Sequence, residues 1–427
     1  MIWPFLLAVL SIYSPQAGAQ DPRNSHCMSC HLAKDSKLLH AFEGSVHGIA
    51  GIGCIGCHGG DPGGETKEDG HLRSKGYSGV LKRRDIPALC GSCHGDEAEM
   101  RKVRLDFRVY EDWKRSKHGR LAAKGDPRVP ICSDCHGDHG ILSRLDPASP
   151  THRRNIAGTC GSCHSDPVKM GASKLPTNQE KEYREGIHGE ILYGKRKGNP
   201  NLVPTCIDCH GGHGAVPPTA RSVPEVCGSC HFEERRFLAQ SPHAESLRFT
   251  GEPSCKDCHG NHHNTIPEEG LQEKVCIPCH NDPKDVGTRE AKAFASLLAR
   301  GGQALGRLDK ALEEAQAREP SSLVSMLLEA EWKRAETAYS TLRKESHTLN
   351  RPIVSKAVED LESIVRTVLA VAENGIDREK GFSETVTMMI LIGVGSGLLV
   401  ASVVVVLLLL RILGRGKDRK AVKAGDS

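Results

Sequence analysis

The sequence has few aromatic residues. Phenylalanine, tryptophan and tyrosine together make up 4% of the 427 residues, whereas glycine alone occurs 45 times. Aromatic side chains bring the largest apolar areas to a protein core. This composition therefore argues against a conventional core in the part of the chain before residue 280, and some other source of apolar bulk is needed there.

A strong excess of one charge is also absent. The formal net charge is +4 at pH 7, and the basic clusters lack the interleaved aromatic residues on which bases of single-stranded nucleic acid stack. A nucleic-acid partner is therefore excluded. The basic clusters suit a solvated face, a docking surface for an acidic partner, or neutralisation of carboxylates. They are Lys82–Arg84, Lys195–Lys197 and Arg235–Arg236.

Cysteine, in contrast, is plentiful and strictly organised. All 18 cysteines belong to nine CxxCH motifs. The paired cysteines are Cys27 and Cys30, Cys54 and Cys57, Cys90 and Cys93, Cys132 and Cys135, Cys160 and Cys163, Cys206 and Cys209, Cys227 and Cys230, Cys255 and Cys258, and Cys276 and Cys279. The histidines that complete the motifs are His31, His58, His94, His136, His164, His210, His231, His259 and His280.

CxxCH is the attachment motif of a c-type haem. The two thiols bond covalently to the haem, and the histidine becomes the proximal axial ligand of the iron. The sequence therefore predicts nine c-type haems, whose macrocycles would supply the missing apolar bulk. We expect this region to fold only with its haems, as small metallo-domains fold only with their metal.

Other uses of paired cysteines explain the motifs less well. A disulfide framework requires cysteines in even number and an oxidising compartment, but it gives no reason for a histidine after every second cysteine. Zinc sites use CxxC pairs with four ligands for each metal, and they do not require this histidine either. A thioredoxin-like CxxC is a single motif near a βαβ pattern, which this sequence lacks.

Both ends of the chain are apolar. Residues 1–19 resemble a secretory signal peptide that ends on an A-x-A cleavage site, with an uncleaved anchor as the alternative. Residues 386–410 form an uncharged run long enough to cross a bilayer. The basic tail 411–427 that follows is then cytoplasmic by the positive-inside rule. These features predict a single-pass inner-membrane protein with its haem domain in the periplasm.

The region from Cys27 to His280 contains an internal repeat. One unit consists of a histidine, a CxxCHG motif and a second CxxCH motif, and it occurs four times after a first, separate motif. The second motif reads CGSCH in three of the units, at Cys90, Cys160 and Cys227. The repeat predicts two-haem modules that follow one another along the chain.

The composition changes near Thr288, where cysteine ends and Ala, Leu, Glu, Lys and Arg dominate. Apolar residues with helical spacing predict three helices in a small antiparallel bundle or stalk. This region contains His347, for which a cofactor role is possible. A single histidine on a polar helix is, however, more often solvated than a metal ligand. The predicted domains are a signal peptide (1–19), a nonahaem domain (20–284), the bundle (285–380), the transmembrane helix (386–410) and the tail (411–427). The fold class is mainly α and irregular, loop-rich and with few strands.

Low-spin haems need a sixth ligand, and methionine is scarce. Outside the CxxCH loops the haem region offers only Met100 and Met170, so histidine must supply most distal ligands. The first candidates precede the Gly-followed motifs; they are His47, His118, His188 and His243. A second set follows the motif histidine by three residues and comprises His139, His213 and His262.

The first repeat unit departs from this pattern, because Asp61 takes the place of a second-set histidine. His71 or His40 can substitute for it, and His26, His152 and His263 are weaker candidates. If two of these do not serve, one haem is five-coordinate and open to a small molecule.

The alternation of S-x-H-G, CxxCHG and CGSCH resembles the multihaem c-type cytochromes of anaerobic and metal-respiring bacteria. From Cys27 to His280 it is similar to their periplasmic pentahaem and decahaem carriers. The resemblance implies closely stacked, bis-histidine haems in anaerobic respiration. The implied donor is a membrane quinol-oxidising complex or another redox protein, and the implied acceptor is a periplasmic or outer-membrane cytochrome or reductase.

Two absent motifs narrow the resemblance. No CxxxxCH occurs, unlike in the smaller class III cytochromes, and no CxxCK occurs, unlike in the pentahaem nitrite reductases. Long helices after a haem cluster also resemble the hydroxylamine oxidoreductase and octahaem reductase group. The alternative is therefore an oxidoreductase that acts on nitrite, hydroxylamine or a tetrathionate-type compound at a five-coordinate haem. The sequence assigns no catalytic residue and favours an electron carrier over an enzyme.

Overall fold

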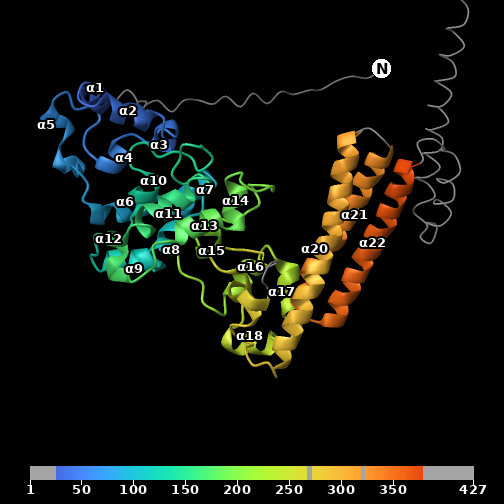
Figure 1. Cartoon of the computed structure of the whole chain (residues 1–427). Coiled ribbons are helices and arrows are strands. Elements are labelled where there is room, and N and C mark those ends of the chain that lie inside the picture. The colour runs from blue at the N-terminus through green and yellow to red at the C-terminus, as the bar shows by residue number, and fades with distance from the viewer. Residues whose placement is uncertain (1–25, 267–271, 319–322, 378–427) are drawn as a thin grey trace, which may run out of the picture. The chain divides into compact units, whose positions relative to one another are not determined.

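The structure is a computed structural model that describes residues 26–266, 272–318 and 323–377. The chain divides into two compact units, Met1–Pro267 and Glu268–Ser427. Each unit is described by itself below (Figure 1). The division falls before the ninth CxxCH motif, so Cys276, Cys279 and His280 belong to the second unit.

The first unit consists of short helices joined by turns. In chain order they are α1 (His26–Leu32), α2 (Ser36–Glu43), α3 (Val46–Ile49), α4 (Ile55–His58), α5 (Lys67–Gly70), η2 (Arg73–Lys75), η3 (Arg83–Asp85), α6 (Ile86–His94), α7 (Glu97–Lys102), α8 (Val109–Arg115), α9 (Lys117–Ala123), α10 (Cys132–His136), α11 (Ile156–His164), α12 (Pro167–Met170), η4 (Gly171–Ser173), α13 (Gln179–Glu185), α14 (Ile187–Leu192), α15 (Cys206–His210), α16 (Val223–Gly228), α17 (Phe232–Leu238), α18 (Ala244–Thr250) and α19 (Cys255–His259). Glycine, proline and turn residues recur too often for longer elements.

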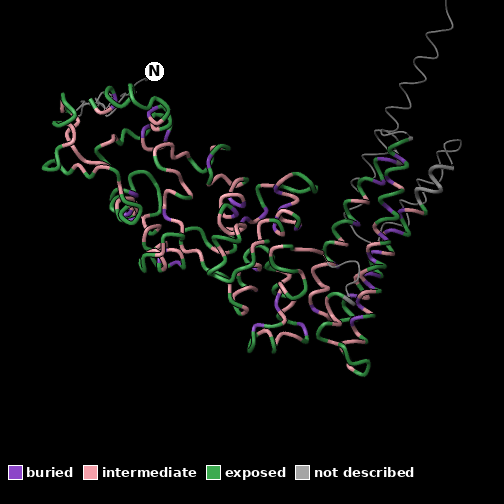
Figure 2. Tube along the Cα trace, turned by 60° about the vertical axis from the view of Figure 1, so that its left-hand side comes forward, coloured by how far each residue is buried: buried purple, intermediate pink, exposed green. Residues whose placement is uncertain are grey.

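The first unit has a very small apolar core. Its cluster of buried hydrophobic residues contains only Ala157, Tyr183, Leu192 and Val203. Figure 2 shows that most of this unit is intermediate or exposed rather than buried. The protein atoms alone therefore bury little apolar area here, and the completion of this core by haem stays a prediction.

The second unit is a bundle of three long helices. After the turn η5 (Gln272–Cys276) come α20 (Val286–Arg318), α21 (Leu323–Glu345), the turn η6 (Ser346–Thr348) and α22 (Arg351–Asp377). Leu308, Leu328, Leu342 and Leu361 are almost completely buried where the three helices meet. The apolar residues recur every three or four positions, so each helix buries one stripe and exposes its charged side.

The predicted fold class needs correction. The described residues are mainly helical and irregular, as predicted, and contain no strand, but the sequence also predicts one transmembrane helix. None of the described helices combines the length and the apolar composition needed to cross a bilayer. The longest ones, α20 and α22, carry charged residues along their exposed faces. The predicted single-pass inner-membrane location is therefore also wrong by this finding.

Several predicted segments fall on residues that the structure does not describe. They are the signal peptide 1–19, the transmembrane helix 386–410 and the basic tail 411–427.

Candidate haem sites

The CxxCH motifs lie on short helices. The motif itself forms α10, α15 and α19, whereas α6 and α11 end on the motif histidine. In α10, α15 and α19 an aspartate between the two cysteines accepts a hydrogen bond from the backbone N–H just before the first cysteine. The N···O distances are 2.6 Å for Ile131 and Asp134, 2.6 Å for Thr205 and Asp208, and 2.7 Å for Ser254 and Asp257. This contact satisfies a donor at the start of the turn. The aspartate therefore holds both cysteines and the histidine on one short helix.

A glycine with positive φ follows four of the motif histidines. These glycines are Gly59 (φ 65°), Gly137 (φ 80°), Gly211 (φ 81°) and Gly260 (φ 76°). Glycine adopts this conformation without the steric cost that other residues incur. The second-set histidine that follows Gly137, Gly211 or Gly260 faces a different motif from the one beside it.

Seven pairs of histidine rings face one another across the first unit. Each pair joins a motif histidine to a histidine from elsewhere in the chain, and the ring centroids lie 5.9–6.3 Å apart. The pairs are His31 and His71, His58 and His139, His94 and His47, His136 and His213, His164 and His118, His210 and His262, and His231 and His188.

The ring separation fits one metal ion between two imidazoles. Imidazole nitrogens bind metal ions at about 2 Å, so two rings on opposite sides of one ion have centroids about 6 Å apart. Burial lowers the pKa of His47 and of His118, and the opposite rings of His94 and His164 lower these pKa values further. A lowered pKa keeps the imidazole neutral, which is the form that binds metal.

The pairs follow two rules along the sequence. His47, His118 and His188 each face the second motif histidine of their own repeat unit, whereas His139 and His213 face the CxxCHG histidine of the preceding unit. His262 follows the same rule as His139 and faces His210. One loop therefore carries the proximal histidine of one site and the distal histidine of the site two motifs earlier. This arrangement interlocks the units.

A repeated hydrogen bond accompanies this interlocking. The backbone N–H just before a first-set histidine donates to the carbonyl two residues after the second-set histidine of the next unit. The N···O distances are 2.8 Å from Val46 to Ile141, 3.4 Å from Lys117 to Ala215 and 3.0 Å from Ile187 to Asn264. The distal histidines of two neighbouring sites are thereby held side by side.

Close packing explains the S-x-H-G sequence at His47 and His118. Ser45 and Ser116 are buried and accept hydrogen bonds from the backbone N–H groups of Gly48 and Gly119 at 3.0 Å. A Cβ atom on Gly119 would lie 2.0 Å from the carbonyl oxygen of Trp113. Only glycine permits this approach of one helix to the end of the preceding helix.

We expect Gly189→Ala to damage one site selectively. A Cβ atom there would lie 2.0 Å from the carbonyl oxygen of Tyr183, so α14 must shift and move His188 away from His231. Overpacking of this kind costs about 1–3 kcal/mol. Thermal unfolding should show a lower midpoint, and low-temperature EPR should show a new high-spin signal from one haem.

Gly306→Ala is the matched control for this substitution. Nothing lies within 4 Å of a Cβ atom at this helical position, so the change should be neutral or stabilise α20 by about 0.5–1 kcal/mol. An EPR spectrum of Gly189→Ala identical to that of the control would contradict the prediction.

The Nδ1 atoms of several motif histidines have fixed partners. They lie 3.1 Å from the Gly79 carbonyl oxygen for His58, 2.9 Å from that of Thr265 for His259, and 2.5 Å from a carboxylate oxygen of Asp285 for His280. The hydrogen bond to His280 also lowers the pKa of Asp285. Such partners fix the tautomer and the orientation of a metal-binding imidazole, so Nε2 is left for the iron.

Motifs that are consecutive in the sequence are also neighbours in space. Burial raises the pKa of Cys209 to about 11, and the nearby thiol of Cys227 contributes to this rise. A hydrogen bond with Cys90, together with burial, raises the pKa of Cys132. The neighbouring thiols are Cys27 and Cys54, Cys57 and Cys90, Cys90 and Cys132, Cys135 and Cys163, Cys160 and Cys206, Cys209 and Cys227, and Cys227 and Cys255. The first eight motifs therefore form a single file.

The structure does not place every candidate histidine in one of the seven pairs. His40 is exposed on α2, His243 lies just before α18, and His26 contacts the Gly64 carbonyl oxygen through Nδ1 at 3.1 Å. The Nδ1 atom of His152 accepts from the N–H group of Arg154.

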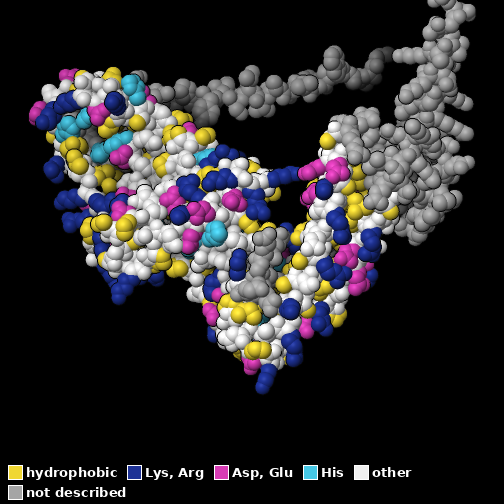
Figure 3. Space-filling view, in the orientation of Figure 1, with side chains coloured by type: hydrophobic (Ala, Val, Ile, Leu, Met, Phe, Trp, Pro, Cys, Tyr) yellow, Lys and Arg dark blue, Asp and Glu magenta, His cyan; other side chains and the backbone are white. Residues whose placement is uncertain are grey.

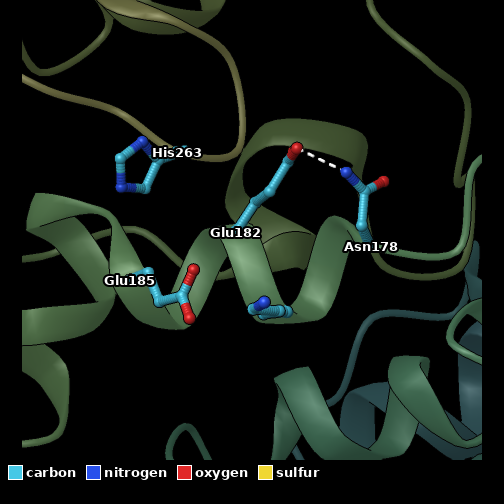
Figure 4. A pocket seen from close by; sticks show the side chains of 5 residues that line it. Asn178, Glu182, Glu185 and His263 are labelled. Atoms are coloured by element: carbon cyan, nitrogen blue, oxygen red, sulfur yellow. Dashed lines mark hydrogen bonds between the residues drawn. The ribbon is translucent and has the colours of Figure 1, made fainter.

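His263 lines a small surface hollow on α13. Figure 4 shows it near Glu182 and Glu185, with Asn178 donating a hydrogen bond to Glu182. Glu182 also lies 3.8 Å from Nδ1 of His262, so the hollow borders one of the seven pairs.

Sequence reasoning did not find three residues that contact the candidate ligands. Asn264 lies 3.0 Å from Nδ1 of His188 through its side-chain oxygen, while Glu182 and Asp285 contact other histidines. Asn264 comes two residues after a second-set histidine, and the equivalent positions hold Ile141 and Ala215. The sequence does not predict these contacts. Asn264 and Glu182 contact histidines that are distant in the chain, and the spacing between Asp285 and His280 does not recur at the other motifs.

The structure also bears on the other uses of cysteine. No two cysteines of the described residues are joined by a disulfide. Within the described residues, no group of three or more His, Cys, Asp or Glu side chains converges as a metal site would require. The facing histidine pairs thus remain the arrangement that fits a metal, with two axial ligands and the other positions left to the macrocycle.

Comparison with known proteins agrees with this geometry. Residues 145–232 match a family described as cytochrome c7 and related cytochrome c. A relative, the multihaem cytochrome MtrA of Shewanella baltica (strain OS185), is 28% identical over 236 residues. The resemblance to multihaem c-type cytochromes is confirmed.

The extent of these matches is limited. The alignment with MtrA covers 52% of this chain and 55% of the relative, so it spans about half the length of that protein. No solved structure matches the chain. The matches support c-type haem iron as the cofactor.

Proposed function

We propose that this chain binds nine c-type haems, the first eight of them in a single file, and transfers electrons along that file between other redox proteins. The observation that carries the proposal is the set of seven facing histidine pairs, each with one CxxCH histidine. When bound, haem supplies one-electron chemistry at its iron. The protein residues bind the group, orient it and set its surroundings.

The paired histidines favour a carrier over an enzyme. At each of the seven sites two imidazoles of the chain itself would hold the haem iron, so no position would be left there for a small nitrogen or sulfur compound. The Nδ1 contacts of His58 and His188 hold these rings in place. A fixed pair of strong ligands changes little between the two oxidation states, which suits rapid electron exchange.

An electron-transfer chain needs a donor and an acceptor. The donor is a quinol-oxidising complex or another redox protein, and the acceptor is a second cytochrome or a reductase. His31 and Cys30 of the first motif are exposed, and Figure 3 shows histidine side chains at the surface over the region of α1 to α5. This end of the file therefore offers a place where a redox partner can approach a haem edge.

Haem counting and EPR test the proposal on the mature holoprotein. Mass spectrometry should show nine covalently attached haems, and low-temperature EPR of the oxidised protein should show only low-spin ferric iron. A mass without covalent haem would refute the proposal. A high-spin signal that shifts when nitrite, hydroxylamine or sulfite is added would replace the carrier by an enzyme with an open site.

A further inference from the structure

The seven histidine pairs differ in the angle between their ring planes. Three pairs are nearly parallel, at 5° for His58 and His139, 7° for His136 and His213, and 16° for His210 and His262. Four pairs are crossed; they are His31 and His71 at 67°, His94 and His47 at 59°, His164 and His118 at 51°, and His231 and His188 at 36°. In chain order the first, third, fifth and seventh motifs are crossed, while the second, fourth and sixth are parallel.

The alternation has a structural cause in the two kinds of distal histidine. The parallel pairs use second-set histidines, which sit on loops that follow a glycine of positive φ. Three of the crossed pairs use first-set histidines, which lie in the first turn of a short helix such as α9 or α14. The fourth crossed pair uses His71, which follows α5 in the longer loop of the first repeat unit. The ring angle thus follows from local backbone structure, and it recurs with the repeat.

One crossed ring is also held by a specific side chain. The Nδ1 atom of His188 lies 3.0 Å from Oδ1 of Asn264, whose own amide donates to the Gly260 carbonyl oxygen at 3.1 Å. The amide group is therefore fixed at both ends and sets the direction of the imidazole. Its pair has the smallest angle among the crossed ones, 36°.

The angle between axial imidazoles affects the electronic structure of ferric iron. Parallel rings donate π electrons into the same iron d orbital, which separates that orbital in energy from its partner. Crossed rings donate into two different orbitals, which then stay nearly equal in energy. Parallel pairs therefore give ordinary rhombic low-spin EPR signals, and crossed pairs give strongly anisotropic signals with a large maximum g value. Because parallel rings stabilise the ferric hole more, they also lower the reduction potential.

We propose that the haems of this chain alternate between two electronic classes along the file, with crossed imidazoles at the odd-numbered motifs and parallel imidazoles at the even-numbered ones, over the first seven motifs. This inference rests on the proposed function, since it requires haems at these pairs. The crossed sites have the higher reduction potentials and are reduced first. The parallel sites have the lower potentials, and each lies between two crossed sites in the file. Such a file has no built-in direction, so the redox partners at its ends decide which way electrons flow.

EPR-monitored redox titration of the complete holoprotein tests the alternation. We expect two families of low-spin signals, the strongly anisotropic one disappearing at the higher potential as the protein is reduced. Asn264→Ala should shift one component of the anisotropic family, because His188 loses the partner that orients it, and should leave the rhombic family unchanged. Asn201→Ala, at an exposed loop position, is the control and should change neither family.

The possible outcomes separate this inference from the proposed function. Low-spin signals of one family only, or two families that titrate in the reverse order, would overturn the alternation and leave the electron carrier standing. Missing haem or high-spin iron at these sites would overturn the proposed function itself. If Asn264→Ala keeps its haem content and an unchanged anisotropic family, Asn264 is not a positioning residue for His188.

Discussion

Replacing His118 by methionine should raise the reduction potential of one haem by more than about 0.1 V, because axial ligands set haem potentials over a range of about 0.8 V. His118 faces His164 at a centroid distance of 6.1 Å, so the variant would convert a bis-histidine site into a His–Met site. A thioether donates less electron density to ferric iron than an imidazole does, and His–Met ligation raises the potential. Spectroelectrochemical titration should show one haem separated from the rest.

His40→Met is the matched control for this prediction. His40 was also a candidate ligand, but it lies exposed on α2 and outside the seven facing pairs. Its replacement should leave the titration curve unchanged. If His118→Met also gives an unchanged curve with full haem content, His118 is not an axial ligand and the pairing rule for the first-set histidines fails.

Production of the chain without haem attachment should leave the first unit unfolded while the second unit keeps its helices. The apolar cluster of the first unit has only four buried residues, whereas the bundle buries a continuous stripe along α20, α21 and α22. Folding that depends on a bound group is lost when that group is absent. Far-UV circular dichroism should retain the signal of the long helices, and limited proteolysis should leave a resistant fragment that contains them.

Two bundle variants make this prediction sharper. Leu361 is completely buried, and its replacement by alanine costs about 2–5 kcal/mol, so it should remove the residual helical signal of the haem-free chain. Ile353→Ala changes a residue that is 41% exposed and should have little effect. A protease-resistant first unit in the haem-free chain would show that the protein atoms alone suffice for its fold.

The repeat units depend on one another through shared loops. Each second-set histidine belongs to one loop and serves the motif of the preceding unit, and the hydrogen bond from Val46 to Ile141 joins the same two units. A ligand lost at one site therefore loosens the loop that carries the site two motifs further along the chain. We expect substitutions at second-set histidines, such as His139, to disturb two haems, at the second and fourth motifs, rather than one.

The predicted transmembrane helix and inner-membrane location are not supported by the helices that the structure describes. The apolar run 386–410 fits a membrane span by length and composition, but it lies outside the described residues, and the helices that the structure does describe are amphipathic. A hydropathy pattern reports only that a segment would be stable in lipid. The expectation of a mainly α and irregular fold is confirmed for the described residues, in which the motifs and their glycines form helical turns and no strand occurs.

The sequence by itself predicted the positions of covalent haem attachment, because the two cysteines and the histidine of a CxxCH motif lie on one turn and need no distant partner. It also determined the repeat and the set of candidate distal histidines. Only the tertiary structure decided that His71, rather than His40, faces His31, that His139 faces His58 rather than the adjacent His136, and at which angle the rings meet. These pairings join residues tens of positions apart, so they depend on how the loops pack and on the left-handed glycines that turn them. The spacing of residues along the chain does not predict how the loops pack, and so it does not predict the histidine pairs.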